Sequence, residues 1–181
     1  MKIILTLLCG LISTFAFAKS ESTYTSVDQE DCLVINSSER MENPEVDFIE
    51  VECAAMGGYQ VFVSGGDLRY NVGLFYQGLE IPTVGPMGFH DLASSKVEWR
   101  YSRQGEPGLE KIDYTAFIYR LSVQGYNEVK EDFEQQDMLI VVRLKGKESC
   151  TIGILTNVPD ANVKAREIAD DTNAKCLELS K

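Results

Sequence analysis

The sequence is poor in the residues on which most catalytic and metal chemistry depends. It has a single histidine, His90, and its 5 cysteines include no Cys-x-x-Cys pair. A zinc site made from four cysteines, or from histidine and cysteine, therefore lacks its usual ligand spacing. No Gly-x-Ser-x-Gly phrase or comparable nucleophile motif accompanies the histidine. We expect no metal, no cofactor and no enzymatic activity.

Long apolar runs are missing after the first 18 residues. Residues 1–18 combine Lys2, an almost uninterrupted apolar stretch and Ala16-Phe17-Ala18, with small residues at the two positions that signal peptidase reads. We interpret 1–18 as a cleaved signal peptide and 19–181 as the mature chain. Because no second run approaches the length of a membrane-spanning helix, we expect a periplasmic or secreted protein without membrane insertion after cleavage.

Basic residues are in the minority. The mature chain has 28 acidic residues against 16 basic ones, because one of the 17 basic residues, Lys2, leaves with the signal. The resulting net charge of about −12 disfavours binding to nucleic acid or to anionic membrane surfaces. It permits a basic partner, although most acidic surfaces serve solubility alone.

Four cysteines remain after signal cleavage, an even number in an oxidising compartment. They allow three pairings, of which we favour Cys32–Cys53 and Cys150–Cys176, because each closes a short loop between neighbouring elements. Each bridge is worth about 3 kcal/mol in the chain-entropy model. Since no linker, repeat or low-complexity tract interrupts 19–181, we expect a single domain.

Alternation of apolar and polar residues predicts a mainly antiparallel β fold. The clearest hairpin joins 59–63 to 68–76 across a turn at 64–67, whose glycine pair is expected to supply positive φ angles. A second hairpin joins 138–144 to 150–155. Other expected strands are 24–27, 32–35, 46–53, 96–101 and 116–124. The predicted fold class is therefore an antiparallel barrel or sandwich of about eight short strands with one C-terminal helix.

The single expected helix is the last element. Asp160 follows Pro159 and is a candidate N-cap. Small and apolar residues then recur at helical spacing on one stripe: Ala161, Ala165, Ile168, Ala169, Thr172 and Cys176. Because Ile168 is the only large member of this stripe, we expect the helix to depend on the bridge between Cys176 and Cys150.

Several short phrases are spread over most of the mature chain. They are Tyr24-Thr25-Ser26 before Cys32, Gly58-Tyr59 leading to Gly66-Asp67-Leu68-Arg69, Val97-Glu98-Trp99-Arg100, Ile118-Tyr119-Arg120-Leu121, Cys150, and Ala161-Asn162 with Ala165-Arg166 in the closing helix. Together they resemble a family of small exported proteobacterial proteins of unknown function. The resemblance implies an exported, disulfide-bonded, mainly β protein, and it implies no activity.

A second resemblance involves Ser64-Gly65 and Tyr70. Periplasmic inhibitors of C-type lysozyme carry a Ser-Gly-x-x-Tyr phrase on a small β-barrel. The gap in this chain is two residues longer than that pattern, so the spacing does not match.

Three arginines are the candidate binding residues: Arg69, Arg100 and Arg120. Each lies in an expected strand, on the face opposite the bulky apolar residues, and Asp67 and Glu98 share that face. Such arginines could hold a carboxylate or phosphate by bidentate contacts. The neighbouring acids instead favour a ladder of surface ion pairs, each worth about a few tenths of a kcal/mol.

Other polar groups are expected on solvated surfaces. His90 and Asp91 could form a catalytic pair, but an exposed loop histidine is the preferred interpretation. Glu50 and Glu52, and the acidic stretch 128–137, which lacks EF-hand order, are expected to face solvent. Four aromatic residues are expected in the core rather than on a ligand platform: Tyr70, Tyr76, Trp99 and Tyr119.

These observations favour a non-enzymatic binding or interaction module of the cell envelope. We expect a monomer whose partner is an unknown protein or a small anionic ligand. The alternative is an inhibitor of a cell-wall hydrolase or protease, with an exposed loop that enters a basic active site. A small hydrolase is the third hypothesis.

Overall fold

The computed structural model describes residues 20–37, 48–67, 69–83, 89–106, 108–127 and 130–178. Within these ranges eleven strands form one sheet, accompanied by a short 3-10 helix, η1 (Gln29–Asp31), and one α-helix, α1 (Ala161–Asp170). The strands are β1 (Glu21–Ser26), β2 (Leu33–Ser37), β3 (Phe48–Cys53), β4 (Tyr59–Gly66), β5 (Arg69–Tyr76), β6 (Leu79–Ile81), β7 (His90–Leu92), β8 (Lys96–Gln104), β9 (Lys111–Asn127), β10 (Asp132–Arg143) and β11 (Cys150–Thr156).

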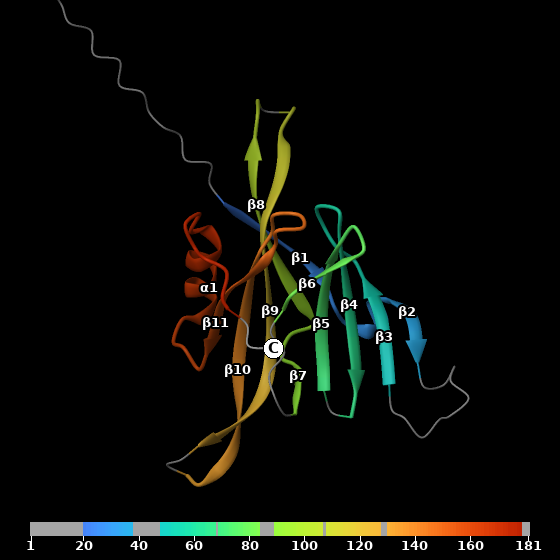
Figure 1. The fold of residues 1–181 in the computed structure, drawn as a ribbon, viewed down its shortest axis with the longest axis vertical. Coiled ribbons are helices and arrows are strands. Elements are labelled where there is room, and N and C mark those ends of the chain that lie inside the picture. The colour runs from blue at the N-terminus through green and yellow to red at the C-terminus, as the bar shows by residue number, and fades with distance from the viewer. Residues whose placement is uncertain are drawn as a thin grey trace, which may run out of the picture.

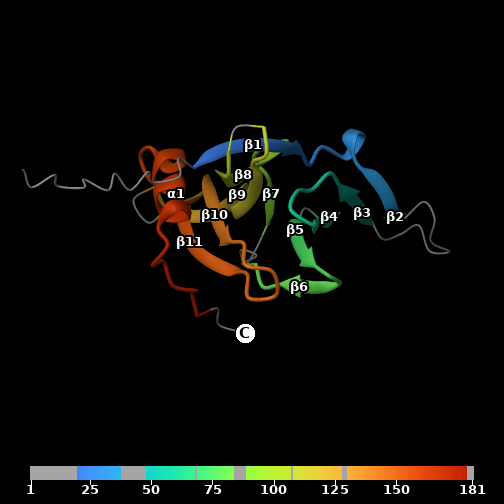
Figure 2. The same ribbon diagram turned by 90° about the horizontal axis from the view of Figure 1, so that it is seen from above.

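The sheet curls into a half-barrel, and α1 lies against its outer face (Figures 1 and 2). The main path of eight strands runs β1-β8-β9-β7-β5-β4-β3-β2, while β10 and β11 extend the other edge of β9 and β6 folds back onto β5. Every pairing between these strands is antiparallel except the contact of β5 with β7. The predicted fold class, mainly β with one C-terminal helix, is confirmed, and the sheet remains open.

Both faces of the central strands are covered. The inner face carries the main core, in which Trp99, Phe117 and Leu121 are buried. Successive residues of a strand point to opposite faces, so the alternate positions of β9 and β10 face α1. They form a smaller core with the helix: Ala116, Ile118, Leu139, Val141, Ile152, Ala165 and Ala169. Because both faces of β8 are covered, residues 97–101 are all buried, and exposed positions do not alternate with buried ones there.

The predicted central hairpin is confirmed, but its turn is not the predicted one. The ladder of β4 and β5 continues to the pair Gly66↔Arg69, and the positive φ of 50° belongs to Asp67 rather than to the glycine pair. Gly65 is required for another reason. A Cβ atom there would lie 2.3 Å from Cε1 of Tyr70, because the tyrosine ring lies across the strand backbone.

Two hairpins are longer than predicted and project as arms at opposite ends of the molecule (Figure 1). β8 runs to Gln104, past the expected end at residue 101, and β9 begins at Lys111, before the expected start at residue 116. β10 begins at Asp132, within the acidic stretch 128–137 and before the expected start at residue 138. Two short strands that the sequence did not predict, β6 and β7, lie between the central hairpin and β8. The predicted signal peptide, residues 1–18, lies outside the described residues.

Both predicted disulfides are formed, Cys32–Cys53 and Cys150–Cys176, as is usual in proteins that fold in an oxidising compartment. The helix is shorter than its predicted stripe: α1 ends at Asp170, so Cys176 lies in the tail that follows. Asp160 precedes the helix in a left-handed conformation, and its side chain makes no capping hydrogen bond. Among the described residues, no helix has the length and apolar character needed to cross a membrane.

The Cys150–Cys176 bridge should therefore stabilise the tail more than the helix. In a Cys150→Ser/Cys176→Ser variant, we expect faster hydrogen exchange at the Leu177 amide, which donates to the Thr151 carbonyl in β11. The Ala169 amide, in the buried helix face, should keep its protection. Equal loss of protection at both amides would contradict this division of roles.

Candidate functional site

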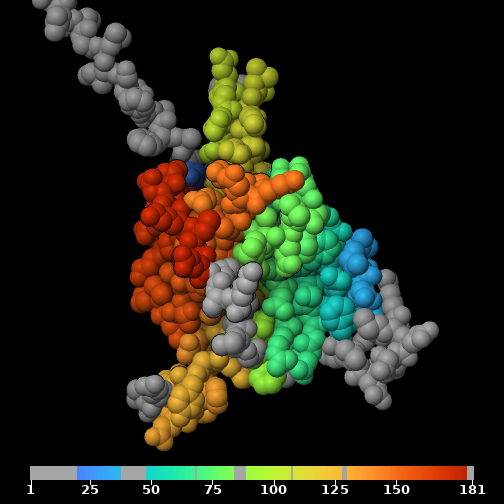
Figure 3. All heavy atoms as spheres, viewed as in Figure 1, coloured from blue at the N-terminus to red at the C-terminus, as the bar shows by residue number. Residues whose placement is uncertain are grey.

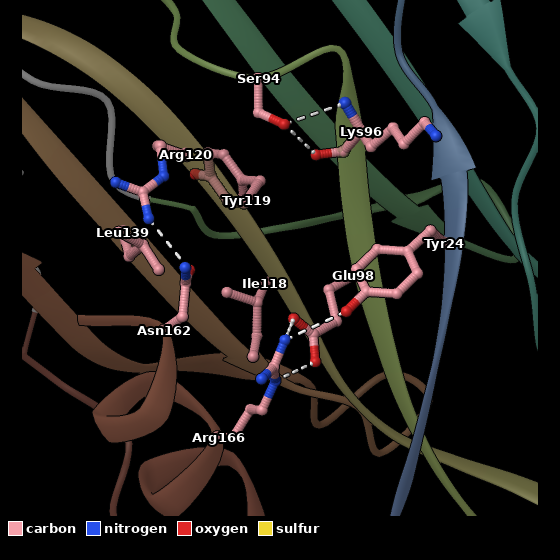
Figure 4. A pocket seen from close by; sticks show the side chains of 10 residues that line it. All are labelled: Tyr24, Ser94, Lys96, Glu98, Ile118, Tyr119, Arg120, Leu139, Asn162 and Arg166. Carbon is pink, nitrogen blue, oxygen red and sulfur yellow. Dashed lines mark hydrogen bonds and ion pairs between the residues drawn. The ribbon is translucent and has the colours of Figure 1, made fainter. Parts of the chain in front are cut away.

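A pocket of about 270 Å³ opens on the outer face of the sheet, beside α1. Strands β1 and β8 form one wall, β9 and β10 form the floor, and the helix forms the opposite wall (Figure 4). Ten residues line it: Tyr24, Ser94, Lys96, Glu98, Ile118, Tyr119, Arg120, Leu139, Asn162 and Arg166.

The helix wall is fixed by a bidentate ion pair between Arg166 of α1 and Glu98 of β8. Arg166 Nε donates to Glu98 Oε1 at 2.7 Å, and Arg166 Nη2 donates to Glu98 Oε2 at 3.0 Å. The same Nη2 atom also donates to the Tyr24 hydroxyl at 3.0 Å (Figure 4). A guanidinium held by two parallel hydrogen bonds has one orientation, so this side of the pocket is preorganised.

A second ion pair lies beside the first, two residues further along β8 and four residues further along α1. Arg100, only 7% exposed, donates from Nε to Asp170 Oδ1 at 3.1 Å and from Nη2 to Oδ2 at 2.5 Å. Ser22 connects the two pairs, because its hydroxyl accepts from Arg100 Nη1 at 2.6 Å and donates to Glu98 Oε1 at 2.5 Å. We call Glu98, Arg100, Arg166 and Asp170 the charge cluster.

The charge cluster keeps the pocket groups in fixed protonation states. Burial alone would raise the pKa of Glu98, but hydrogen bonds from Arg166 and Ser22 and the charges of Arg166 and Arg100 outweigh it, so this pKa lies below its ordinary value. The hydrogen bonds to Glu98 in turn raise the pKa of Arg166. Neither group exchanges protons near neutral pH, as a general acid or base would need to do.

Arg120 faces the pocket from the side opposite Arg166, with Ile118 and Leu139 between them (Figure 4). Its Nη1 pairs with Asp137 at 2.5 Å, and its Nη2 donates to Asn162 Oδ1 at 2.9 Å. With Lys96 at the rim, the lining holds three cations and one carboxylate, in a chain whose net charge is −11. The lining therefore has more cations than carboxylates, with Asp137 beside it as the partner of Arg120.

The hydrogen-bond donors of this pocket match the chemistry of an anion. A guanidinium has five N–H donors in a rigid fork, and Arg120 and Arg166 each use only part of this set within the protein. The apolar floor adds a surface for a nonpolar portion of a ligand. Within the described ranges, no three histidine, cysteine, aspartate or glutamate side chains group as metal ligands would.

The three predicted arginines do not form one row. Arg120 lines the pocket, and Arg69 forms a surface pair with Asp67 at 2.6 Å, with its side chain 44% exposed. The prediction for Arg100 was wrong: it is buried, because α1 covers the outer face of β8. A surface ladder through all three is therefore excluded.

Sequence reasoning missed the helix residues of the site, Asn162, Arg166 and Asp170. One signal for two of them was available. Glu98 and Arg100 alternate in charge at strand spacing, and Arg166 and Asp170 have opposite charges four residues apart, which places them on one helix face. These two patterns are complementary when the helix lies along the strand.

The interpretation of His90 as an exposed loop residue was also wrong. It is 5% exposed, because β7 is enclosed between β5 and β9, and its Nε2 lies 3.2 Å from Asn71 Oδ1. Asp91, its neighbour along the strand, points to the other face and accepts from the Leu92 amide at 2.7 Å.

The remaining predictions for polar and aromatic residues can be placed as well. Glu50 and Glu52 are only half-exposed, and Glu52 accepts from the Gln60 side chain. Trp99 and Tyr119 are buried as predicted, while Tyr70 and Tyr76 are partly buried against the main core.

Because Arg100 is buried and Arg69 is exposed, replacing them by alanine should lower the free energy of unfolding by very different amounts. We expect Arg100→Ala to lower the free energy of unfolding by about 3 kcal/mol, because it removes the bidentate partner of Asp170 and a buried side chain under the helix. Arg69→Ala should cost less than about 1 kcal/mol, as exposed pairs do. Urea denaturation of the two variants measures both. Equal costs would show that the Arg100 pair is solvated.

The lowered pKa of Glu98 predicts a loss of stability in acid. Because its pKa is lower in the folded chain than in the unfolded one, its contribution is complete above the ordinary value of 4.5 and is lost as the pH falls through the folded value. Thermal unfolding of wild type and Glu98→Gln between neutral pH and pH 3 measures this. The wild type should lose more stability below 4.5 than the variant, and parallel curves would contradict the assignment.

Comparison with known proteins gives no match: no protein-family model, curated protein or solved structure is similar to this chain. The resemblance to small exported proteobacterial proteins stays a prediction from the sequence. Three of the phrases that carry it, Val97–Arg100, Ile118–Leu121 and Ala161–Arg166, meet at the pocket and its charge cluster.

Proposed function

We propose that this chain is an exported, non-enzymatic binding protein of the periplasm or the outside medium, and that its pocket binds a small carboxylate. The observation that carries the proposal is the position of Arg120 and Arg166, whose guanidinium groups face one cavity from opposite sides (Figure 4). The two disulfides and the signal-like segment 1–18 support export.

Charge and shape both favour an anionic ligand with an apolar portion. Arginine matches the planar geometry of a carboxylate, and a half-enclosed site strengthens the attraction relative to bulk water. Ile118 and Leu139 form a floor that cannot hydrogen-bond to a ligand, so a purely polar anion leaves this surface unused. A volume of about 270 Å³ fits a small molecule rather than a polymer.

The charge states support a binding role over a catalytic one. Glu98 is ionised and Arg166 protonated at neutral pH, since each shifts the pKa of the other away from neutrality. Such groups hold a ligand by fixed charges and do not relay protons.

Benzoate is a suitable probe, because it joins one carboxylate to an apolar ring. We expect benzoate to raise the melting temperature of the mature protein in a concentration-dependent way, by binding to the folded state. Benzyl alcohol, which has a similar shape without the charge, should have no such effect. Acetate, which lacks the ring, should bind more weakly than benzoate.

Two arginine variants separate this pocket from general charge effects. Arg120→Gln removes a pocket cation and should abolish the benzoate response, whereas Arg69→Gln, at an exposed pair outside the pocket, should retain it. Wild type without a benzoate response, or an equal response in Arg120→Gln, would reject the carboxylate site.

A further inference from the structure

The β9–β10 arm carries an aromatic pair that lies outside both cores. Tyr126 and Phe133 are directly opposite each other in the ladder, and they are 55% and 65% exposed. Their rings meet edge to face with centroids 5.4 Å apart. Exposed aromatic surface of this kind is characteristic of protein–protein interfaces.

The arm holds this pair away from the rest of the sheet. Strand β7 pairs with β9 only as far as Val123, and β11 pairs with β10 only from Met138 onward. Beyond these points the described part of the arm consists of its own two strands, and Figure 3 shows it standing clear of the body. A ligand can therefore reach the arm from more than one side.

The face with the aromatic pair continues toward the body. Gln124 and Gln135, which share this face, line a pocket of about 350 Å³ together with Phe89. Phe89 is 43% exposed, and the Arg69 guanidinium lies 5.1 Å from its ring centroid. The arm thus presents aromatic rings next to side-chain amides, which combine apolar contact with hydrogen bonding.

The charge of the arm indicates its partner. Residues 124–137 contain five acidic residues and one lysine, a net charge of −4. Two of the acids are paired, Glu134 with Lys130 and Asp137 with Arg120. Glu131 and Asp132 remain exposed near the aromatic pair. A cationic surface is complementary to this combination, and an anionic or neutral one is not.

We propose that the β9–β10 arm docks into a cleft of a cationic protein. Two strands side by side are about 5 Å apart, so the arm is narrow enough to enter a groove and too narrow to cover a flat surface. Tyr126 and Phe133 supply the apolar contact, and Glu131 and Asp132, which lie nearer the tip of the arm, pair with basic groups inside the cleft. This proposal does not depend on the carboxylate pocket.

A C-type lysozyme is the probe, since it is cationic and has an open substrate cleft. We expect the mature wild-type chain to bind it in calorimetry at about 50 mM salt and more weakly at about 300 mM, as ionic screening increases. Tyr126→Ser/Phe133→Ser should weaken binding at least about tenfold, the effect expected for a pair of central aromatic contacts. Unchanged melting temperature shows that this variant is folded.

Two controls assign the binding to this arm. Leu109→Ser, at an 81% exposed residue of the β8–β9 arm, should bind lysozyme as the wild type does. Arg120→Gln should also bind, which separates this result from the carboxylate proposal.

Three outcomes would overturn the proposal. Wild type that does not bind lysozyme at low salt excludes the cationic cleft, and full binding by the double variant excludes the arm. Sedimentation that shows a dimer of the wild type, lost in the double variant, would assign the aromatic pair to a second copy of this chain.

Discussion

The complementary order of charges on β8 and α1 is the constraint on which the outer face of this protein depends. A strand presents every second side chain on one face and a helix every fourth, so Glu98 and Arg100 can face Arg166 and Asp170 only when helix and strand lie in one relative position. The helix contributes mostly alanines to its buried face, which allow close approach and specify little. The ion pairs therefore determine where the helix lies, and the helix completes the pocket.

Buried ion pairs often add little net stability, because desolvation offsets much of the attraction between the charges. Their value here is geometric. Arg166 is held against Glu98 by two hydrogen bonds, and Arg120 is held by Asp137 and Asn162, so the two guanidinium groups are oriented before a ligand arrives. An acidic protein thus holds a few arginines in fixed orientations by placing acids beside them.

The sequence was a good guide where one face of a strand is buried. The alternation of Val61 and Val63, or of Val72 and Leu74, follows the inner core directly, and the cysteine spacing indicated both disulfides. It was a poor guide where a second layer covers the sheet. Arg100 looks like a surface residue in a one-sided sheet and His90 like an exposed loop residue, yet Arg100 is buried under α1 and His90 is buried in β7, between β5 and β9. Such burial depends on contacts between segments that are distant in sequence, which local periodicity does not contain.

The strand order divides the sheet into two halves, one made of β2–β6 and the other of the remaining strands. Among the described residues, the β2–β6 half of the sheet pairs with the other half only at Arg69 of β5 and His90 of β7. The two halves share one continuous inner core, so side-chain packing rather than a hydrogen-bonded ladder makes them a unit. Side-chain hydrogen bonds add to this packing, since the Tyr59 hydroxyl contacts Ser149 and accepts from the Gly146 amide, whereas within each half the strands are joined by backbone ladders. Each half of the half-barrel is therefore held together by strand ladders, and the two halves are held to each other mainly by side chains.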